Sequence, residues 1–300
     1  MYLTYFQQLF KKMPSKKLSK IYKSNELNQS NFNDYELSIY RVLLNIMTKI
    51  KHRDQDGLPI KNIAENRIYS LSADEYAQEF NLSKSVAYRT LQKAVKKLVK
   101  STILLPKTLN GKVGISEITV CSEAFYEENS GKIDIEFSEK IMPHLIKLNN
   151  KFTMYNLCEI TGFNSIYTTR LYELLMQYKT TGKLDISVEK LRYSLGCIET
   201  KNLYADFKRS GFGHAISEIN SNYEININFK EIKKGKSVDR IVFSFKKAEL
   251  TQVYDSVTKK IRNQLTRPKK KKVENNEISG VSSAREAFTE LANKLRVKEK

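Results

Sequence analysis

The chain has 300 residues, which suits two domains of ordinary size with additional terminal segments. Lys and Arg number 52 and Asp and Glu number 33, so the formal net charge of +19 favours a polyanionic partner, with nucleic acid ahead of a membrane surface. No apolar run is long enough to span a bilayer, and three cysteines far apart in the sequence argue against a disulfide framework and for a reducing cytoplasm.

The first recognisable pattern is a series of capped helices. Residues 36–50 carry apolar side chains at helical spacing. Ser72 can cap a helix over ADEYAQEF, and Glu75 is its capping-box partner. Asn81-Leu82 then makes a turn, and Ser83 caps a further helix, KSVAYRTLQKAVKKLV. A helix, a tight turn and a second helix are the plan of a helix-turn-helix.

Two β-hairpins are predicted next. Residues 103–120 alternate in polarity around Asn110-Gly111, a strong hairpin-turn signal. A second hairpin joins residues 124–128 to KIDIEF through a turn at Asn129-Ser130-Gly131. Hairpins that follow a helix-turn-helix predict a winged helix.

The same order of elements recurs in the second half. Helices are predicted over 156–161, 165–178, 187–196 and most of 203–222, followed by two strands within 224–245. A basic stretch, 259–272, and a short helix from 283 complete the chain. The predicted fold class is therefore α+β, with two tandem winged helices and a basic C-terminal tail. The predicted domains are an N-terminal extension (1–20), two winged helices (21–140 and 141–250) and the tail (251–300).

The helix after Ser83 has a polar face that could read DNA. At 100° per residue, its apolar side chains fall on one broad face, and the opposite face carries Ser85, Arg89, Gln92, Lys93 and Lys96. Arg can donate two hydrogen bonds to guanine, and Gln pairs in the same way with adenine. An ordinary solvated helix face is the alternative, and the capped helix and turn before it favour recognition.

In the second unit, Leu203 and Phe207 are interpreted as core residues. The candidate DNA contacts beside them and in the lysine-rich turn between the last two strands are Tyr204, Lys208, Arg209, Lys233, Lys234, Lys236 and Arg240. Phosphate contact is expected for the lysines of the turn because lysine is a flexible point charge.

These segments resemble the replication initiator (Rep) proteins of theta-replicating, iteron-bearing bacterial plasmids. The resemblance covers residues 21–247. In the first unit it rests on KSNELNQSNF, YELSIYRVLL and YAQEFNLSKSVAYRTLQKAVKKL. In the second it rests on FTMYNLCEITGFNSIYTTRLYELLMQY, ISVEKLRYSLG, DFKRSGFGHAISEIN and FKEIKKGKSVDRIVFSF.

The resemblance implies two winged helices that bind directly repeated origin sites as a monomer, and a dimer that represses the initiator's own gene. It implies a host initiator and a helicase as partners. It places the recognition roles on the 83–99 helix and on 203–222. The chain departs from the family at Gly211-Phe212-Gly213-His214, where larger residues and a proline are usual, so a kink is expected near 211–213.

Three other functions compete with this interpretation. A rolling-circle nicking enzyme needs a metal held by closely spaced histidines, whereas His52, His144 and His214 are isolated. A P-loop ending at Gly235-Lys236-Ser237 lacks its first glycine and does not open a helix. A pure transcription repressor binds DNA in the same way and is not separated by composition. The sequence therefore predicts a DNA-binding initiator with no catalytic residues, metal or cofactor.

Overall fold

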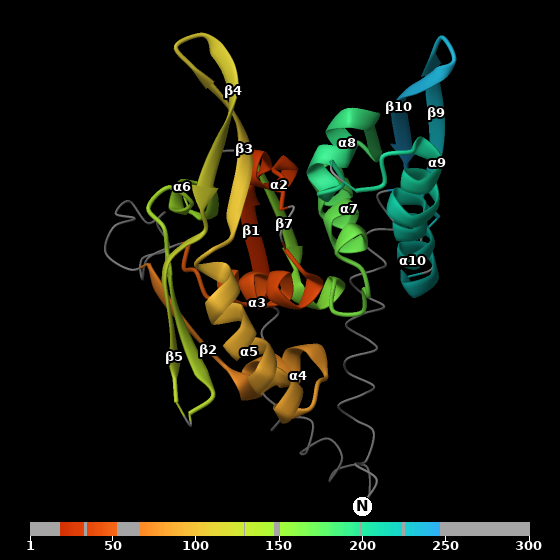
Figure 1. Cartoon of the computed structure of the whole chain (residues 1–300). Coiled ribbons are helices and arrows are strands. Elements are labelled where there is room, and N and C mark those ends of the chain that lie inside the picture. The colour runs from red at the N-terminus through yellow and green to blue at the C-terminus, as the bar shows by residue number, and fades with distance from the viewer. Residues whose placement is uncertain are drawn as a thin grey trace, which may run out of the picture. The chain divides into compact units, whose positions relative to one another are not determined.

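Helices and strands alternate along the described part of the chain, residues 19–32, 35–52, 67–128, 130–146, 151–198, 200–223 and 226–246 of the computed structural model (Figure 1). Up to residue 145 the elements are β1 (Lys20–Ser24), α2 (Asn25–Gln29), α3 (Leu37–Met47), β2 (Ile68–Ser72), α4 (Ala73–Phe80), α5 (Lys84–Leu98), β3 (Thr102–Leu109), β4 (Lys112–Thr119), β5 (Cys121–Glu127), β6 (Lys132–Phe137) and α6 (Met142–Leu145).

From residue 152 the elements are β7 (Phe152–Asn156), a 3-10 turn (Leu157–Glu159), α7 (Ile166–Gln177), β8 (Lys183–Ser187), α8 (Val188–Leu195), α9 (Tyr204–Asp206), a π-helical segment (Phe207–Phe212), α10 (Gly213–Tyr223), β9 (Asn228–Lys234) and β10 (Ser237–Ser244).

The predicted helix-turn-helix of the first half is confirmed. The Ser72 hydroxyl accepts a hydrogen bond from the Glu75 amide at 3.2 Å, and the Glu75 carboxylate accepts one from the Ser72 amide at 3.0 Å, so the capping box forms at the start of α4. Asn81 ends α4 in the left-handed conformation with φ of 53°. Ser83 then caps α5 through the Val86 amide. Local side-chain chemistry thus sets both helices and the turn between them.

The strands of the first half form a wing behind this helix pair. β6 lies between β2 and β5 in an antiparallel sheet, so the β5–β6 hairpin is the wing of a winged helix. β3 and β4 form a separate long hairpin that turns at Asn110 and Gly111, with φ of 51° and 75°. Positive φ at both positions is what a two-residue hairpin turn requires.

The pairing of β1 with β7 was not predicted. Lys20–Ser24 runs antiparallel to Phe152–Asn156, so the helix expected over 156–161 is reduced to the 3-10 turn Leu157–Glu159. Residues on both sides of the predicted division at 140 and 141 therefore share one sheet. The buried positions of β1 include Lys23, whose side chain conceals the alternation of a half-buried strand.

The second half forms another winged helix. β10 lies between β8 and β9, Ser187 caps α8, and Gly196 ends α8 with φ of 71°. The expected kink is present, since Gly211 has non-helical angles (φ −99°, ψ −106°) within the π-helical segment. A Cβ on Gly213 would lie 2.2 Å from the Lys208 carbonyl oxygen, so only glycine lets the chain pass so close to itself there.

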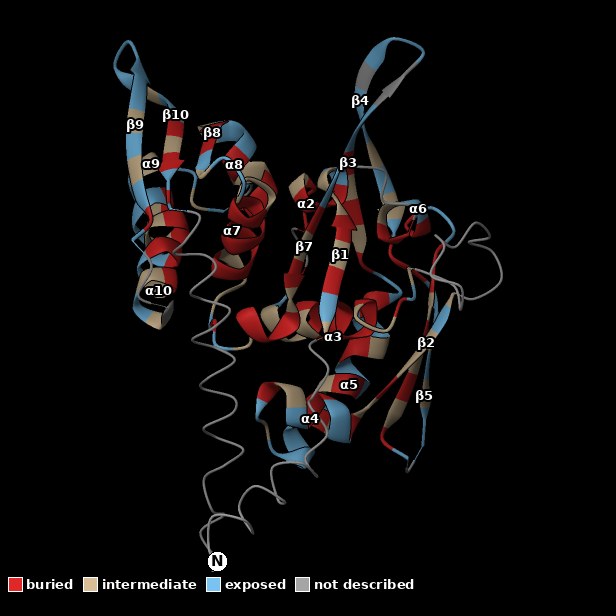
Figure 2. Ribbon diagram, turned by 180° about the vertical axis from the view of Figure 1, so that it is seen from behind, coloured by how far each residue is buried: buried red, intermediate tan, exposed pale blue. Residues whose placement is uncertain are grey.

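A buried ionic cluster joins α7 to β1, α3 and β7. The Glu173 carboxylate on α7 lies 2.6 Å from Lys23 Nζ of β1 and 2.6 Å from Arg170 Nη1, and these side chains are at most 1% exposed. The hydroxyls of Tyr40 and Tyr155 also donate to Glu173. Figure 2 shows that buried residues run along α3 and α7, the helices that hold most of this cluster. One carboxylate thus serves two buried cations.

Burial and neighbouring charge act in opposite directions on these groups. Burial lowers the pKa of Lys23 to about 7, although Glu173 beside it favours the charged ammonium. Burial alone would raise the pKa of Glu173, but Lys23 and Arg170 outweigh it and hold that pKa below its ordinary value. Glu173 is therefore ionised at neutral pH.

The remaining sequence predictions concern the C-terminal segments, the cysteines and membrane-spanning helices. The basic stretch 259–272 and the helix expected from residue 283 lie outside the described residues. Cys121, Cys158 and Cys197 are buried thiols. In the part of the chain that the structure describes, no helix is both long enough and apolar enough to cross a membrane.

Candidate nucleic-acid interface

Helix α5 presents its polar face to solvent because its apolar face is fixed in the core. Ala87, Leu91, Ala94 and Leu98 are completely buried. The wing turn lies directly against the helix, since a Cβ on Gly131 would come within 2.3 Å of the Tyr88 ring. Packing from α3, α4 and the wing thus determines which side chains of α5 point outward.

All five residues predicted on the outer face of α5 are exposed: Ser85, Arg89, Gln92, Lys93 and Lys96. Arg89 makes a long contact of 3.4 Å from Nε to the Ser85 carbonyl oxygen and forms no ion pair with any described residue. Lys93 is held differently, because its Nζ lies 2.5 Å from the Glu36 carboxylate before α3. That hydrogen bond is the main cause of the lowered pKa of Glu36.

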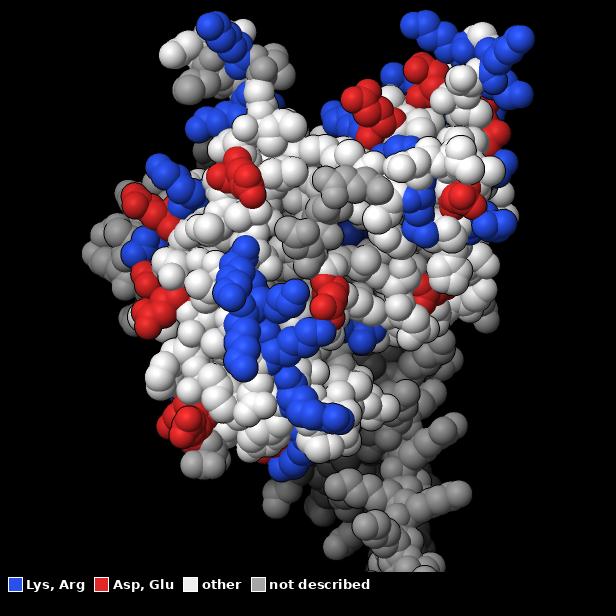
Figure 3. Space-filling model, viewed as in Figure 1, with Lys and Arg blue, Asp and Glu red and all other residues white. Residues whose placement is uncertain are grey.

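Lys97 and Lys100, which are not among the predicted contacts, extend the basic outer face of α5. An open hollow of about 520 Å³ is lined by Lys93, Lys96, Lys97, Lys100 and Ser101. Figure 3 shows Lys and Arg side chains gathered over α5. Lys97 and Lys100 follow Lys93 and Lys96 at intervals of four residues, so the helical spacing could have identified them. The surface has the chemistry of a phosphate site.

The turn of the second helix-turn-helix is clamped by Arg192 of α8. Its guanidinium donates to the carbonyl oxygens of Lys201 and Asn202 and lies 4.4 Å from the centre of the Phe207 ring. Arg192 therefore fixes the chain just before α9. Its role was not predicted, because its partners are backbone carbonyls that the sequence does not single out.

The predicted contacts on the second recognition segment all have partners within the chain. The Tyr204 hydroxyl lies 2.7 Å and Lys208 Nζ 2.8 Å from Glu231 Oε1 of β9, and Arg209 pairs with Asp206 at 2.7 Å. Lys208 and then Tyr204 are the main causes of the lowered pKa of Glu231. The ion pairs of Lys208 and Arg209 lie at the surface and contribute at most about 1 kcal/mol each, so a phosphate could displace them.

The interpretation of Leu203 as a core residue is wrong. Its side chain is 69% exposed, whereas Phe207 is fully buried. Leu203 is the capping residue before α9, so it precedes the helix and does not share the position of the buried Phe207. It therefore presents an apolar side chain at the start of the second recognition segment.

The last hairpin carries exposed lysines at its tip. Lys233, Lys234 and Lys236 surround Gly235, which has φ of 63° and makes the turn between β9 and β10. Within the described ranges, Lys234 and Lys236 form no ion pair. The P-loop interpretation is excluded here because residues 235–237 turn between two strands instead of opening a helix.

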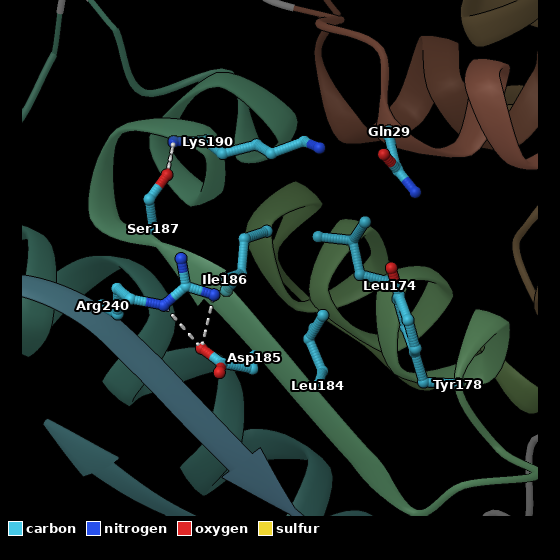
Figure 4. Close-up of a pocket in the computed structure, with 9 residues that line it drawn as sticks. All are labelled: Gln29, Leu174, Tyr178, Leu184, Asp185, Ile186, Ser187, Lys190 and Arg240. Atoms are coloured by element: carbon cyan, nitrogen blue, oxygen red, sulfur yellow. Dashed lines mark hydrogen bonds and ion pairs between the residues drawn. The ribbon is translucent and has the colours of Figure 1, made fainter. Parts of the chain in front are cut away.

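Arg240 lies away from this tip, beside a small pocket. Its guanidinium is 2.9 Å from the Asp185 carboxylate, a neighbour across the β8–β10 pair (Figure 4). The pocket has a volume of about 180 Å³ and lies between Gln29 of α2 and residues of α7, β8, α8 and β10. Lys190 extends across it toward Gln29 in Figure 4.

The histidines lie on separate parts of the fold. His52 packs against the Tyr22 ring, with ring centres 4.4 Å apart, and His214 is exposed on α10. His144 Nδ1 lies 2.9 Å from the Ser24 hydroxyl and 3.7 Å from Glu26. Serine and carboxylate approach the same ring nitrogen, so this trio lacks the relay of a hydrolytic triad. Among the described residues, no group of three His, Cys, Asp or Glu could hold a metal ion.

Comparison with known families matches most of the described chain. The family described as "Initiator Replication protein, WH1" matches residues 20–176, and "Initiator Rep protein, WH2" matches residues 187–245. A replication initiation protein of Escherichia coli is 29% identical over 208 residues, which are 67% of this chain and 62% of that protein. The chain thus spans somewhat less than two thirds of that relative.

Two further comparisons involve one kind of initiator. The PI protein of Escherichia coli is 26% identical over 257 residues, covering 67% of this chain and 84% of that protein. The crystal structure of Pi initiator protein in complex with iteron DNA matches with a TM-score of 0.63 at 24% identity, over 77% of this chain and 98% of that one. This structural likeness establishes the fold of two tandem winged helices.

Proposed function

Because the chain belongs to the family of initiator replication proteins with WH1 and WH2 domains, we propose that it initiates replication of a bacterial plasmid by binding repeated double-stranded DNA sites at the origin. The observation that carries this proposal is the exposed basic face of α5, held outward by a buried apolar face within a helix-turn-helix. The crystallised Pi initiator was bound to iteron DNA, which supports the same class of target.

In this proposal α5 enters the major groove. Arg89 and Gln92 read base edges, because both are exposed and Arg89 forms no ion pair with a described residue. The lysines that line the hollow on α5 contact phosphates on either side of the groove. Lys93 exchanges its contact with Glu36 for a phosphate when DNA binds.

The second winged helix contacts a neighbouring segment of the same site. Tyr204, Lys208 and Arg209 turn from their acidic partners to the DNA backbone. In this proposal the exposed Leu203 contacts a thymine methyl group, since the first residues of a recognition helix approach the bases. Arg240 holds β8 against β10 through Asp185 and contributes to binding indirectly.

The family resemblance extends the proposal to regulation and partners. A dimer of the chain represses its own gene, and a host initiator and the replicative helicase assemble with it at the origin. The protein then acts in the bacterial cytoplasm, where plasmid DNA lies. It has no catalytic role: a covalent adduct between one of its tyrosines and origin DNA would instead support a rolling-circle nicking enzyme.

Replication in cells separates an initiator from a pure repressor. A vector whose only origin is the DNA flanking this gene should replicate when the full chain is supplied from a second plasmid, and should be lost without it. Plasmid copy number is the measurement. A chain that represses its promoter but never sustains the vector would be a transcription repressor.

The lysines at the tip of the β9–β10 hairpin should act through charge alone. Replacing Lys233, Lys234 and Lys236 with alanine is expected to reduce the slope of log K against log salt by roughly 0.9 for each phosphate that is no longer neutralised, without changing base preference. Binding titrations of cognate and scrambled duplexes at several salt concentrations measure both quantities.

The matched control removes three exposed lysines outside both helix-turn-helix units, Lys20, Lys140 and Lys151. This variant has the same net charge as the hairpin variant, so a smaller change of slope would localise the effect to the hairpin. Equal slopes for the hairpin variant and the unaltered chain would mean that the hairpin points away from DNA.

A further inference from the structure

The two winged helices meet where α8 contacts earlier parts of the chain. The Tyr193 hydroxyl donates to the Leu104 carbonyl oxygen of β3 at 2.7 Å, and the Ser194 hydroxyl donates to the Gln29 carbonyl oxygen of α2 at 3.0 Å. Helix α8 is the first helix of the second helix-turn-helix, and β3 follows directly after α5. These contacts therefore connect the two DNA-reading units through very few residues.

Arg170 reinforces the same junction from inside. Its side chain is 1% exposed, and it donates to the carbonyl oxygens of Asn28 at 2.7 Å, Ser30 at 2.9 Å and Ser194 at 3.2 Å. Asn31, which follows Ser30, exchanges two backbone hydrogen bonds with Leu104 of β3, at 3.0 and 3.2 Å. Arg170 thus binds α8, the end of α2 and, through that segment, β3.

Hydrogen bonds to backbone carbonyls give this junction a defined geometry. The carbonyl oxygens that Arg170 contacts are buried, so they would incur a desolvation penalty on losing these donors, and the units therefore resist separation or sliding. Close apolar packing does not fill the whole junction, because a pocket of about 180 Å³ remains between Gln29 and the second winged helix (Figure 4). Donors with fixed directions therefore set the relative placement of α8 and β3.

We propose that Arg170, Tyr193 and Ser194 form a spacing clamp that fixes the number of base pairs between the two DNA segments read by one molecule. The proposal rests on the proposed DNA-binding function. Inserting base pairs between the two segments moves one of them by about 3.4 Å and rotates it by about 34° per pair. A clamped molecule cannot follow this movement and loses the gain from binding both segments at once.

The test uses the full chain and duplexes carrying one mapped site, either native or with two base pairs inserted between the segments that the two winged helices contact. The unaltered chain should lose about 100-fold in affinity on the inserted duplex, a typical gain from linked binding. The double variant Tyr193→Phe, Ser194→Ala should lose about 10-fold or less on insertion, because a loosened junction tolerates both spacings. The Arg170→Lys variant should reduce the difference in affinity between the native and the inserted duplex further.

The control variant Tyr126→Phe, Ser122→Ala removes the same two kinds of hydroxyl from β5. Its ratio of affinity for the native duplex to affinity for the inserted duplex should equal that of the unaltered chain. If the Tyr193→Phe, Ser194→Ala variant has the same affinity ratio as the unaltered chain, the clamp is overturned. This holds also where the variant binds both duplexes more weakly by the same factor, because such a loss signifies general destabilisation. The double variant leaves the Arg170 cluster intact, so the test stands even where Arg170→Lys fails to fold.

Failure of the clamp can be told apart from failure of the proposed function. An unaltered chain that binds the native site specifically but is indifferent to the insertion overturns the clamp and leaves the function standing. An unaltered chain with no preference for any site over scrambled DNA overturns both.

Discussion

Replacing Glu173 with glutamine is expected to destabilise the fold by about 3–5 kcal/mol, the usual consequence of removing one partner from a buried ion pair. Lys23 and Arg170 both lie 2.6 Å from this carboxylate and are almost fully buried. Glutamine has nearly the same shape but no charge, so the buried Arg170 would lose its counter-charge, and Lys23 could stay buried only by giving up its proton. In a domain of this size the midpoint of thermal unfolding should fall by roughly 10 °C.

Lys23→Met is the matched control at the same cluster. It leaves Arg170 and Glu173 paired one to one. Because burial already lowers the pKa of Lys23 to about 7, loss of its charge at neutral pH should cost about 1 kcal/mol or less. Thermal unfolding of both variants at pH 7 measures the difference. Equal losses would show that the cluster acts through packing and not through charge.

Replacing Arg89 and Gln92 together with alanine should weaken binding to the cognate site by about 2–6 kcal/mol, the sum of about 1–3 kcal/mol for each base-reading contact. Both side chains are exposed on α5, so neither contributes to the core. Binding to a scrambled duplex should change much less, because phosphate contacts supply most of that affinity. Competition between the two duplexes gives the discrimination directly.

Arg89→Lys sharpens this experiment. Lysine keeps the positive charge but lacks the planar fork that donates two hydrogen bonds to guanine. The variant should therefore retain affinity for scrambled DNA and lose discrimination at one base pair. Equal loss on both duplexes for Arg89→Ala, with full rescue by lysine, would assign Arg89 to a phosphate instead.

Much of the fold follows from local chemistry that can be read in the sequence. The capping box at Ser72 and Glu75, the Ser83 cap and the Asn110-Gly111 turn each involve residues at most three positions apart. The kink at Gly211 also follows from composition, because glycine weakens a helix wherever it stands. Patterns formed by residues a few positions apart predict the helices, strands and turns. They also predict which side chains lie on the outer face of α5.

Features made by distant residues were missed. The β1–β7 pair joins segments more than a hundred residues apart, and its buried Lys23 looks like a surface residue until Glu173 is placed beside it. The acidic partners of Tyr204, Lys208 and Arg240 are equally invisible in a one-dimensional pattern. The sequence therefore indicates candidate cations but not which of them pair with an acidic side chain.

The position of the domain boundary depends on contacts between distant segments of the chain. A division at residues 140 and 141 was predicted where the second hairpin ends. The β1–β7 pair and the match of WH1 to residues 20–176 both extend past that position, so we propose a later division, between α7 and β8. The number of winged helices follows from the order of elements, whereas the division between them depends on strand pairing across the chain.

Footprinting of the purified full chain on the DNA that flanks its gene tests the central claim most directly. An initiator of this kind should protect several directly repeated sites, spaced by whole helical turns, with each site contacted in two successive major-groove segments. The Arg89 and Gln92 double variant should leave the same DNA unprotected at equal concentration. Protection of one inverted repeat alone, or uniform weak protection of any sequence, would contradict an initiator that reads repeated origin sites.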